Sequence, residues 1–120
     1  MKKRIFLVDD TDTVLMFEKM MLAREYDVCV AKNGKEALAS IEKSRPDMIL
    51  LDIVMPEMDG ITTCQQLKAN PATKEIPVVI VTTKGEPDRV SAAFSAGCND
   101  YLTKPINRVN LLEKIHEFLG

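Results

Sequence analysis

The stretch Leu50–Gly60, LLDIVMPEMDG, carries an apolar run that stops on one aspartate, after which the chain breaks over Met-Pro and Asp-Gly. Such dipeptides are turn signals, so Asp52 is expected at the end of a strand. An aspartate in an apolar layer costs free energy unless it is paired, hydrated or coordinated to a cation. The rest of the chain is therefore expected to supply partners for Asp52.

Four other short apolar runs are similar to the run that ends at Asp52. All five are rich in β-branched residues and mostly continuous, which is typical of strands buried on both faces. The five predicted strands are Arg4–Asp9, Asp27–Lys32, Met48–Asp52, Pro77–Thr82 and Asp100–Thr103.

Amphipathic segments alternate with these runs, and apolar residues recur in them at spacings of three, four and seven, which predicts helices packed on a sheet. Their predicted inner faces are Val14, Phe17 and Met21; Ala37, Leu38 and Ile41; Ile61 and Cys64; Val90, Ala93, Phe94 and Gly97; and Leu111, Ile115, Phe118 and Leu119. Five strands alternating with five helices predict an α/β fold with a doubly wound, five-stranded parallel sheet and helices on both faces.

The size and composition indicate one ordinary domain, residues 1–120. A net charge of −2 gives no general attraction to nucleic acid or to anionic membranes. No apolar run approaches the roughly 18 residues that cross a bilayer. Three widely spaced cysteines fit neither a metal motif nor a disulfide framework, so we expect reduced thiols in a cytoplasmic protein. The chain ends at Gly120, which fits either a stand-alone domain or part of a longer protein.

Polar side chains close most of the predicted strands. Ligands of doubly wound sheets bind beyond the carboxyl ends of the strands, near the point where the strand order reverses. The residues expected to converge there are Asp9, Asp10, Asp52, Thr82 and Lys104.

This set predicts phosphoryl transfer onto an aspartate. Carboxylates that lie close together either raise one another's pKa or bind a cation, and an all-oxygen site suits Mg²⁺. Lys104 and Thr82 can take the phosphoryl oxygens that the cation leaves free. A carboxylate beside Mg²⁺ is also a possible nucleophile toward phosphorus.

Four motifs, in chain order, resemble those of response-regulator receiver domains, the phospho-acceptor modules of bacterial two-component signalling. They are VDD at Val8–Asp10, PDMILLDIVMPEMDG at Pro46–Gly60, IPVVIVTT at Ile76–Thr83 and DYLTKPI at Asp100–Ile106. The resemblance covers essentially the whole chain and is to the chemotaxis-regulator type. It implies a flavodoxin-like (βα)₅ fold with strand order 2-1-3-4-5.

The resemblance also implies the roles of the site residues. Asp52 would be the phosphorylated residue. Mg²⁺ would be held by Asp10, Asp52 and the backbone carbonyl of Val54, with Asp9 reaching it mainly through water. Lys104 would pair with Asp52 or its phosphoryl group.

Two further residues would carry the signal onward. Thr82 would hydrogen-bond the phosphoryl oxygen, and Tyr101 occupies the position of the family's switch aromatic. The Lys104–Pro105 peptide bond resembles one that is cis in the family.

The implied function is that of a phosphorelay switch rather than of an enzyme. A histidine kinase or histidine phosphotransfer protein would donate the phosphoryl group, and the surface of the fourth helix, fifth strand and fifth helix would change for a downstream protein or effector domain. We expect no direct contact with nucleic acid or membrane, and a monomer or a phosphorylation-dependent homodimer. Val54 and Lys84 would flank the path of the hydrolytic water, and since neither supplies an acceptor, we expect slow self-dephosphorylation.

Two alternatives remain open at this level. Asp10-Thr11-Asp12-Thr13 also resembles the D-x-D-x-T motif of haloacid-dehalogenase-type phosphatases, which would make Asp10 the nucleophile, but that interpretation leaves Asp52 unexplained. A flavodoxin-type electron carrier would share the fold. The acidic first loop would repel the flavin phosphate, and the chain has no tryptophan and only two tyrosines for a flavin sandwich.

Overall fold

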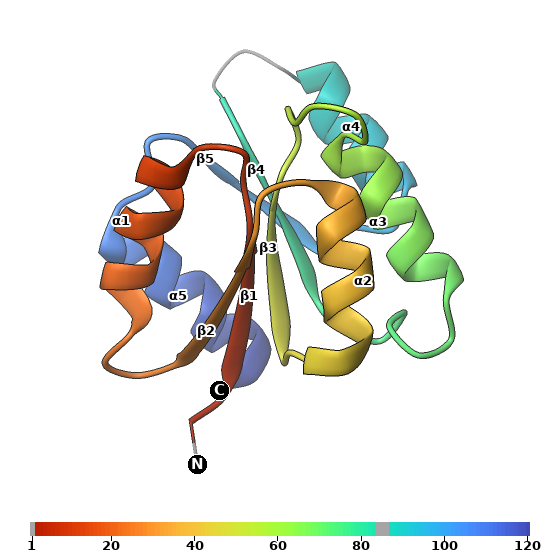
Figure 1. Ribbon diagram of the computed structural model, residues 1–120. Coiled ribbons are helices and arrows are strands. Elements are labelled where there is room, and N and C mark those ends of the chain that lie inside the picture. Colours follow the sequence, from red (N-terminus) through yellow and green to blue (C-terminus); the bar gives the residue numbers. More distant parts are fainter. Residues whose placement is uncertain (1, 84–86) are drawn as a thin grey trace.

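The computed structural model describes residues 2–83 and 87–120, in which five parallel strands form one sheet in the order β2-β1-β3-β4-β5 (Figure 1). The strands are β1 (Arg4–Val8), β2 (Asp27–Ala31), β3 (Met48–Asp52), β4 (Val78–Thr82) and β5 (Asp100–Thr103). Each bound lies within one residue of its predicted position. The topology confirms the doubly wound α/β fold and the strand order that the resemblance implied.

A helix follows each strand. The helices are α1 (Asp12–Leu22), α2 (Gly34–Ser44), α3 (Gly60–Ala69), α4 (Pro87–Ser95) and α5 (Arg108–Leu119). Within the described part of the chain, none of them is both long enough and apolar enough to cross a membrane.

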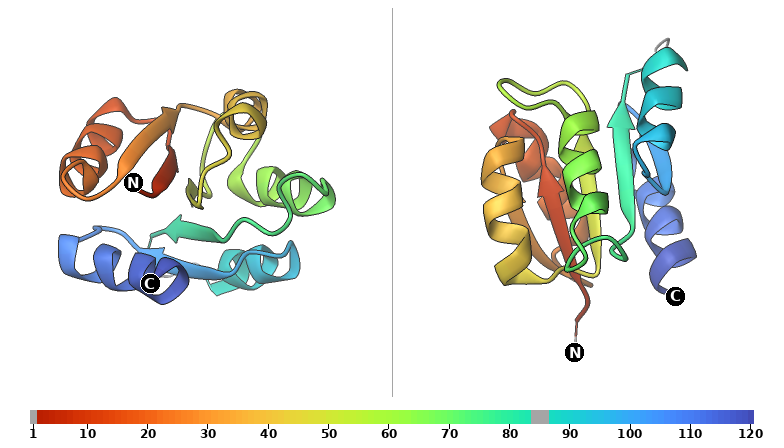
Figure 2. Two further views of the ribbon diagram at one scale, coloured as in Figure 1. Left: turned by 90° about the horizontal axis from the view of Figure 1, so that it is seen from below. Right: turned by 90° about the vertical axis from the view of Figure 1, so that its right-hand side faces the viewer.

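The sheet separates two apolar layers because the side chains of its central strands alternate between faces. In β1, Ile5 and Leu7 belong to the layer under α1 and α5, whereas Phe6 and Val8 belong to the layer under α2, α3 and α4. Figure 2 shows α2, α3 and α4 side by side on their face of the sheet. Burial on both faces explains why the central strands read as continuous apolar runs.

The predicted inner face of α1 is wrong. The helix buries Leu15, Glu18 and Leu22, whereas Phe17 is 59% exposed. Val14 and Met21 are only partly buried. Both sets of residues share the spacing of an amphipathic helix, and the carboxylate at position 18 interrupts the set that faces the sheet.

The helix α4 buries a narrower face than predicted. Ala93 is fully buried, but Phe94 is 43% exposed and Val90 only partly buried. The ring of Phe94 instead meets Tyr101 of β5 edge-on, with centroids 6.2 Å apart. Gly97 lies beyond the end of α4 with a φ of 105°, which favours glycine, and it is exposed.

Candidate functional site

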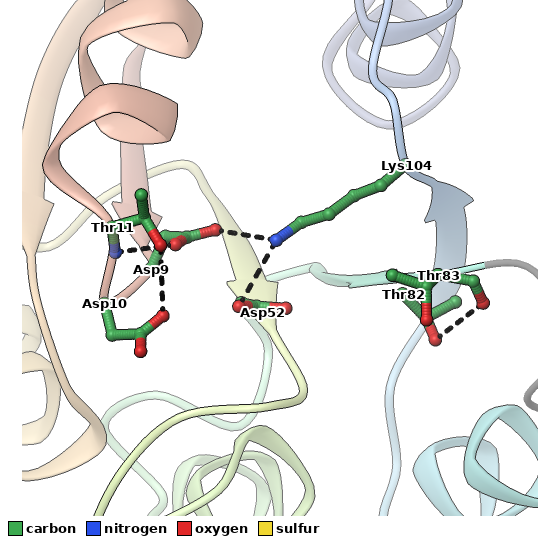
Figure 3. Close-up of polar contacts among 7 residues, drawn as sticks. All are labelled: Asp9, Asp10, Thr11, Asp52, Thr82, Thr83 and Lys104. Carbon is green, nitrogen blue, oxygen red and sulfur yellow. Dashed lines mark hydrogen bonds and ion pairs between the residues drawn. The ribbon is translucent and has the colours of Figure 1, made fainter.

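Three carboxylates meet at the carboxyl ends of β1 and β3, where the strand order reverses (Figure 3). Asp9 and Asp10 directly follow β1, and Asp52 is the last residue of β3. One carboxylate oxygen of each lies within 4.8 Å of the others. Asp9 and Asp52 are buried, whereas Asp10 is exposed at the rim. Their oxygens fit the ligand preference of a hard cation such as Mg²⁺.

Lys104 crosses the carboxyl edge of the sheet toward these acids (Figure 3). Its Nζ lies 3.2 Å from Oδ2 of Asp9 and 3.4 Å from Oδ2 of Asp52. Burial acts to lower the pKa of Lys104, but the two carboxylates outweigh this effect and raise it. One ammonium group faces three carboxylates, so the site keeps an excess of negative charge that a divalent cation would offset.

The Asp52 carboxyl has a perturbed acidity. Burial, followed by repulsion from Asp9, raises the pKa of Asp52 to about 6, against the opposing effect of Lys104. Desolvation and like charge therefore both disfavour its ionised form. Anything that adds positive charge beside Asp52 favours the carboxylate, which is the nucleophilic form.

The backbone around Asp52 depends on a glycine. Gly60 is the first residue of α3, and a Cβ at this position would collide with the carbonyl oxygen of Asp52. The Gly60 amide donates a hydrogen bond to the carbonyl of Ile53 at 2.8 Å, and the Asp59 side chain caps α3 by accepting from the amide of Thr62. The MPEMDG turn thus brings the start of α3 against the end of β3.

Asp9 is oriented by the loop that follows it. Its Oδ1 accepts a hydrogen bond of 2.9 Å from the amide of Thr11, and its Oδ2 contacts Lys104. Both oxygens of Asp9 are therefore engaged. For Asp52, by contrast, the described residues provide one ion pair, which is the contact with Lys104.

The remaining predicted residues lie on the other side of Asp52. Thr82 ends β4, next to β3, and its buried hydroxyl donates a hydrogen bond of 3.4 Å to the carbonyl of Thr83. The amide of Lys104 donates to the Thr82 carbonyl at 2.7 Å, and the Lys104–Pro105 bond is cis. Tyr101 is 42% exposed, with its ring against Phe94.

Of the two residues expected to flank the hydrolytic water, the structure describes Val54. Val54 lies two residues beyond β3 and its side chain is 55% exposed. Lys84 lies outside the described residues.

Glu18 is a titratable residue beside the site that the sequence patterns did not indicate. It is 4% exposed on the inner face of α1. Burial, followed by repulsion from Asp9, raises the pKa of Glu18 to about 7, while Lys104 opposes the rise. One signal in the sequence could have indicated its burial, because Glu18 lies between Leu15 and Leu22, which are seven residues apart and share one helix face.

The doubly wound sheet, with acids at its switch point and a lysine facing them, defines a class of α/β proteins whose site suits Mg²⁺ and phosphate. Within this class, the profile of the response regulator receiver domain matches residues 5–116. The chain belongs to the response regulator receiver domain family. Members of this family are the phospho-acceptor domains of two-component systems, and this membership favours the receiver interpretation over the phosphatase and flavodoxin alternatives.

Relatives of different total lengths contain a sequence similar to this chain. The response regulator PleD of Caulobacter vibrioides is 43% identical over 117 residues, which are 96% of this chain but 26% of PleD. The chain thus spans about a quarter of the length of that relative. The protein PilH of Pseudomonas aeruginosa is 40% identical over 118 residues, and the match covers 98% of both proteins.

Solved structures agree with the fold. The Vibrio cholerae chemotaxis protein CheY4 superimposes with a TM-score of 0.93 at 28% identity, covering 99% of this chain and 100% of CheY4. The receiver domain of the sensor histidine kinase PA1611 from Pseudomonas aeruginosa gives 0.90 at 28% identity, covering 100% and 99%. In that structure a magnesium ion is coordinated in the active-site cleft.

Proposed function

We propose that the domain accepts a phosphoryl group on Asp52 from a histidine kinase or a histidine phosphotransfer protein. Mg²⁺ would be held by Asp10, Asp52 and the carbonyl of Val54, with Asp9 reaching it mainly through water. The observation that carries this proposal is the position of Asp52. It is a buried acid of the cluster, and it faces Lys104 at 3.4 Å.

The surroundings favour Asp52 over the two neighbouring acids as the nucleophile. Both oxygens of Asp9 are engaged, by the Thr11 amide and by Lys104. Asp10 is exposed, where water would compete for an acyl phosphate. Asp52 is buried, and within the described ranges its second oxygen has no hydrogen bond or ion pair. This oxygen can attack phosphorus while the bond from phosphorus to the donor breaks and the donor keeps the electron pair.

The chain's residues would then hold the new charge. Bound Mg²⁺ supplies charge neutralisation at the phosphoryl oxygens. The Lys104 ammonium pairs with one of these oxygens in place of the lost carboxylate charge, and the Thr82 hydroxyl turns from the carbonyl of Thr83 to another. Movement of Thr82 frees space for the exposed Tyr101 ring to turn inward, which changes the surface of α4, β5 and α5.

The phosphorylated domain would act as a switch in a phosphorelay, and it would not turn over an external substrate. The altered surface would control a downstream protein or an attached effector domain, with the domain acting as a monomer or as a phosphorylation-dependent homodimer in the cytoplasm. No direct binding to nucleic acid or membrane is part of this proposal.

A small phosphodonor tests the proposal without the partner kinase. Incubation with acetyl phosphate and Mg²⁺ is expected to phosphorylate the domain, and excess EDTA is expected to prevent it. Phosphorylation that proceeds equally well in EDTA would contradict the role of the acid cluster. Phosphorylation of Asp52→Asn at the parental rate would contradict the nucleophile.

A further inference from the structure

A groove of about 660 Å³ lies between α1 and the segment that follows β5. This volume is within the usual range of small-molecule sites, roughly 300–1,000 Å³. Its walls are mostly apolar, and the residues that line it are Val14, Phe17, Glu18, Met21, Thr83, Lys104, Pro105 and Ile106. The phosphorylation chemistry proposed above uses only Lys104 of this set.

One charged group of the groove has no ion-pair partner among the residues that the structure describes. Glu18 is 4% exposed, yet no hydrogen bond or ion pair to its carboxylate occurs for the residues described. No side-chain oxygen of the described residues is both fully enclosed and unpaired, so the carboxylate oxygens of Glu18 stay open to the groove, where a cationic ligand can pair with them. Glu18 therefore provides a specific polar anchor inside an otherwise apolar surface.

The sign of the surrounding charge selects the ligand. Asp9 and Asp52 both repel the ionised form of Glu18. The Lys104 ammonium, which attracts it, is already shared between those two aspartates at 3.2 and 3.4 Å. The groove thus ends at a region of net negative charge, and it favours a cation.

The apolar walls select the rest of the ligand. Phe17 is 59% exposed and Met21 and Val14 are partly buried, so a ligand body can cover all three. We propose that this groove binds a small amphipathic cation, an aliphatic amine or amidine whose nitrogen pairs with Glu18 and whose apolar body lies against α1. Such a ligand would occupy a site beside Lys104 and separate from the acid cluster.

Matched probes test this proposal by NMR on the full chain in Mg²⁺-containing buffer near pH 8, where Glu18 is ionised. Hexylamine, 1-hexanol and hexanoate share one apolar body and differ in charge. We expect hexylamine to shift the amide signals of Val14, Met21 and Ile106 saturably, 1-hexanol to shift them more weakly, and hexanoate to leave them unchanged.

Three variants separate charge from apolar contact. Glu18→Gln keeps the shape of the side chain and should weaken hexylamine binding roughly tenfold, the value of a charge-assisted hydrogen bond, while leaving the response to 1-hexanol intact. Phe17→Ala, at an exposed position, should weaken binding of both probes. Glu36→Gln on α2 removes an equal charge from an exposed site and should change neither.

Two results would overturn the proposal. The first is an unchanged dissociation constant for hexylamine in Glu18→Gln. The second is a hexylamine response confined to Asp9, Asp10 and Asp52, which would place the amine at the acid cluster instead.

Discussion

The ammonium of Lys104 lies 3.4 Å from Oδ2 of Asp52, although the two residues are 52 positions apart in the chain. The contact spans the carboxyl edge of the sheet from β5 to β3 and crosses over β4, which lies between these strands. Lys104 is the cationic partner of the proposed nucleophile, and its charge lowers the pKa of Asp52 against the effects of burial and of Asp9.

Replacement of Lys104 by glutamine should raise the pKa of Asp52 above its value of about 6, because burial and repulsion from Asp9 would then act without opposition. Carboxyl carbon chemical shifts followed against pH without Mg²⁺ measure this change. Lys114→Gln serves as the control, since Lys114 pairs with Asp100 at 2.7 Å away from the cluster. An Asp52 pKa that is unchanged or lower in Lys104→Gln would contradict the electrostatic account.

Mg²⁺ should raise the melting temperature of the unphosphorylated domain, because a ligand that binds only the folded state stabilises it. At a concentration one hundred times the dissociation constant, the gain is about 2.7 kcal/mol, which corresponds to roughly ten degrees. Asp10→Ala should remove most of this shift. It should also raise the melting temperature without Mg²⁺, since it relieves repulsion among the acids.

The matched control for the Mg²⁺ experiment is Asp12→Ala. Asp12 is also an exposed aspartate, at the start of α1, but it pairs with Lys32 at 3.0 Å and lies outside the cluster. Its Mg²⁺ response should equal that of the parent. A full response in Asp10→Ala, or an equal loss in both variants, would show that the cluster is not the cation site.

The buried Glu18 should make the domain less stable as the pH rises. The pKa of Glu18 is about 7 in the folded state against an ordinary value of 4.5, so between these pH values the folded protein holds a proton that the unfolded chain has lost. The stabilisation is complete below 4.5 and is lost as the pH rises through 7. Asp52 acts in the same direction between 3.8 and about 6.

Glu18→Gln should remove the part of this pH dependence that Glu18 contributes. At 1.36 kcal/mol per pKa unit, the variant should exceed the parent in free energy of unfolding by up to about 3 kcal/mol near pH 8, and by little near pH 5. Urea unfolding at both pH values without Mg²⁺ gives the comparison, with Glu36→Gln as the control for charge. A variant that is less stable than the parent near pH 8 would refute the assignment of Glu18 as a desolvated acid.

The phosphoryl group on Asp52 should be long-lived, because Val54 has no group to orient an attacking water. Val54→Asn should speed the loss of phosphate from the purified phosphoprotein by up to about a hundredfold, the lower end of the effect of a positioned acid–base group. Val54→Leu keeps the apolar character and should leave the rate unchanged. Equal rates in all three proteins would show that this position does not set the lifetime.

The strands could be predicted from the sequence to within one residue, because strands buried on both faces read as continuous apolar runs bounded by turns. The order of the strands was not contained in that pattern and came from the family resemblance. The convergence of Asp9, Asp10, Asp52 and Lys104 followed from their places at strand ends, since the carboxyl ends of parallel strands share one edge.

Helix faces were harder to predict, and α1 shows why. Its buried face contains Glu18, and a carboxylate in an amphipathic pattern normally marks the solvent side. Phe17 is exposed, but because it is apolar it favoured the wrong face in the prediction. The groove beside Glu18 depends on the distance between α1 and the segment after β5, which no local pattern encodes.

Locating the acyl phosphate tests the central claim most directly. After the parent protein is phosphorylated by acetyl phosphate with Mg²⁺, peptide mass spectrometry should find the modification on Asp52, and Asp52→Asn should carry none. Asp59→Asn, which keeps the capping amide oxygen at the start of α3, should be labelled like the parent. An acyl phosphate on Asp10 in the parent would contradict this account and favour the phosphatase-type chemistry.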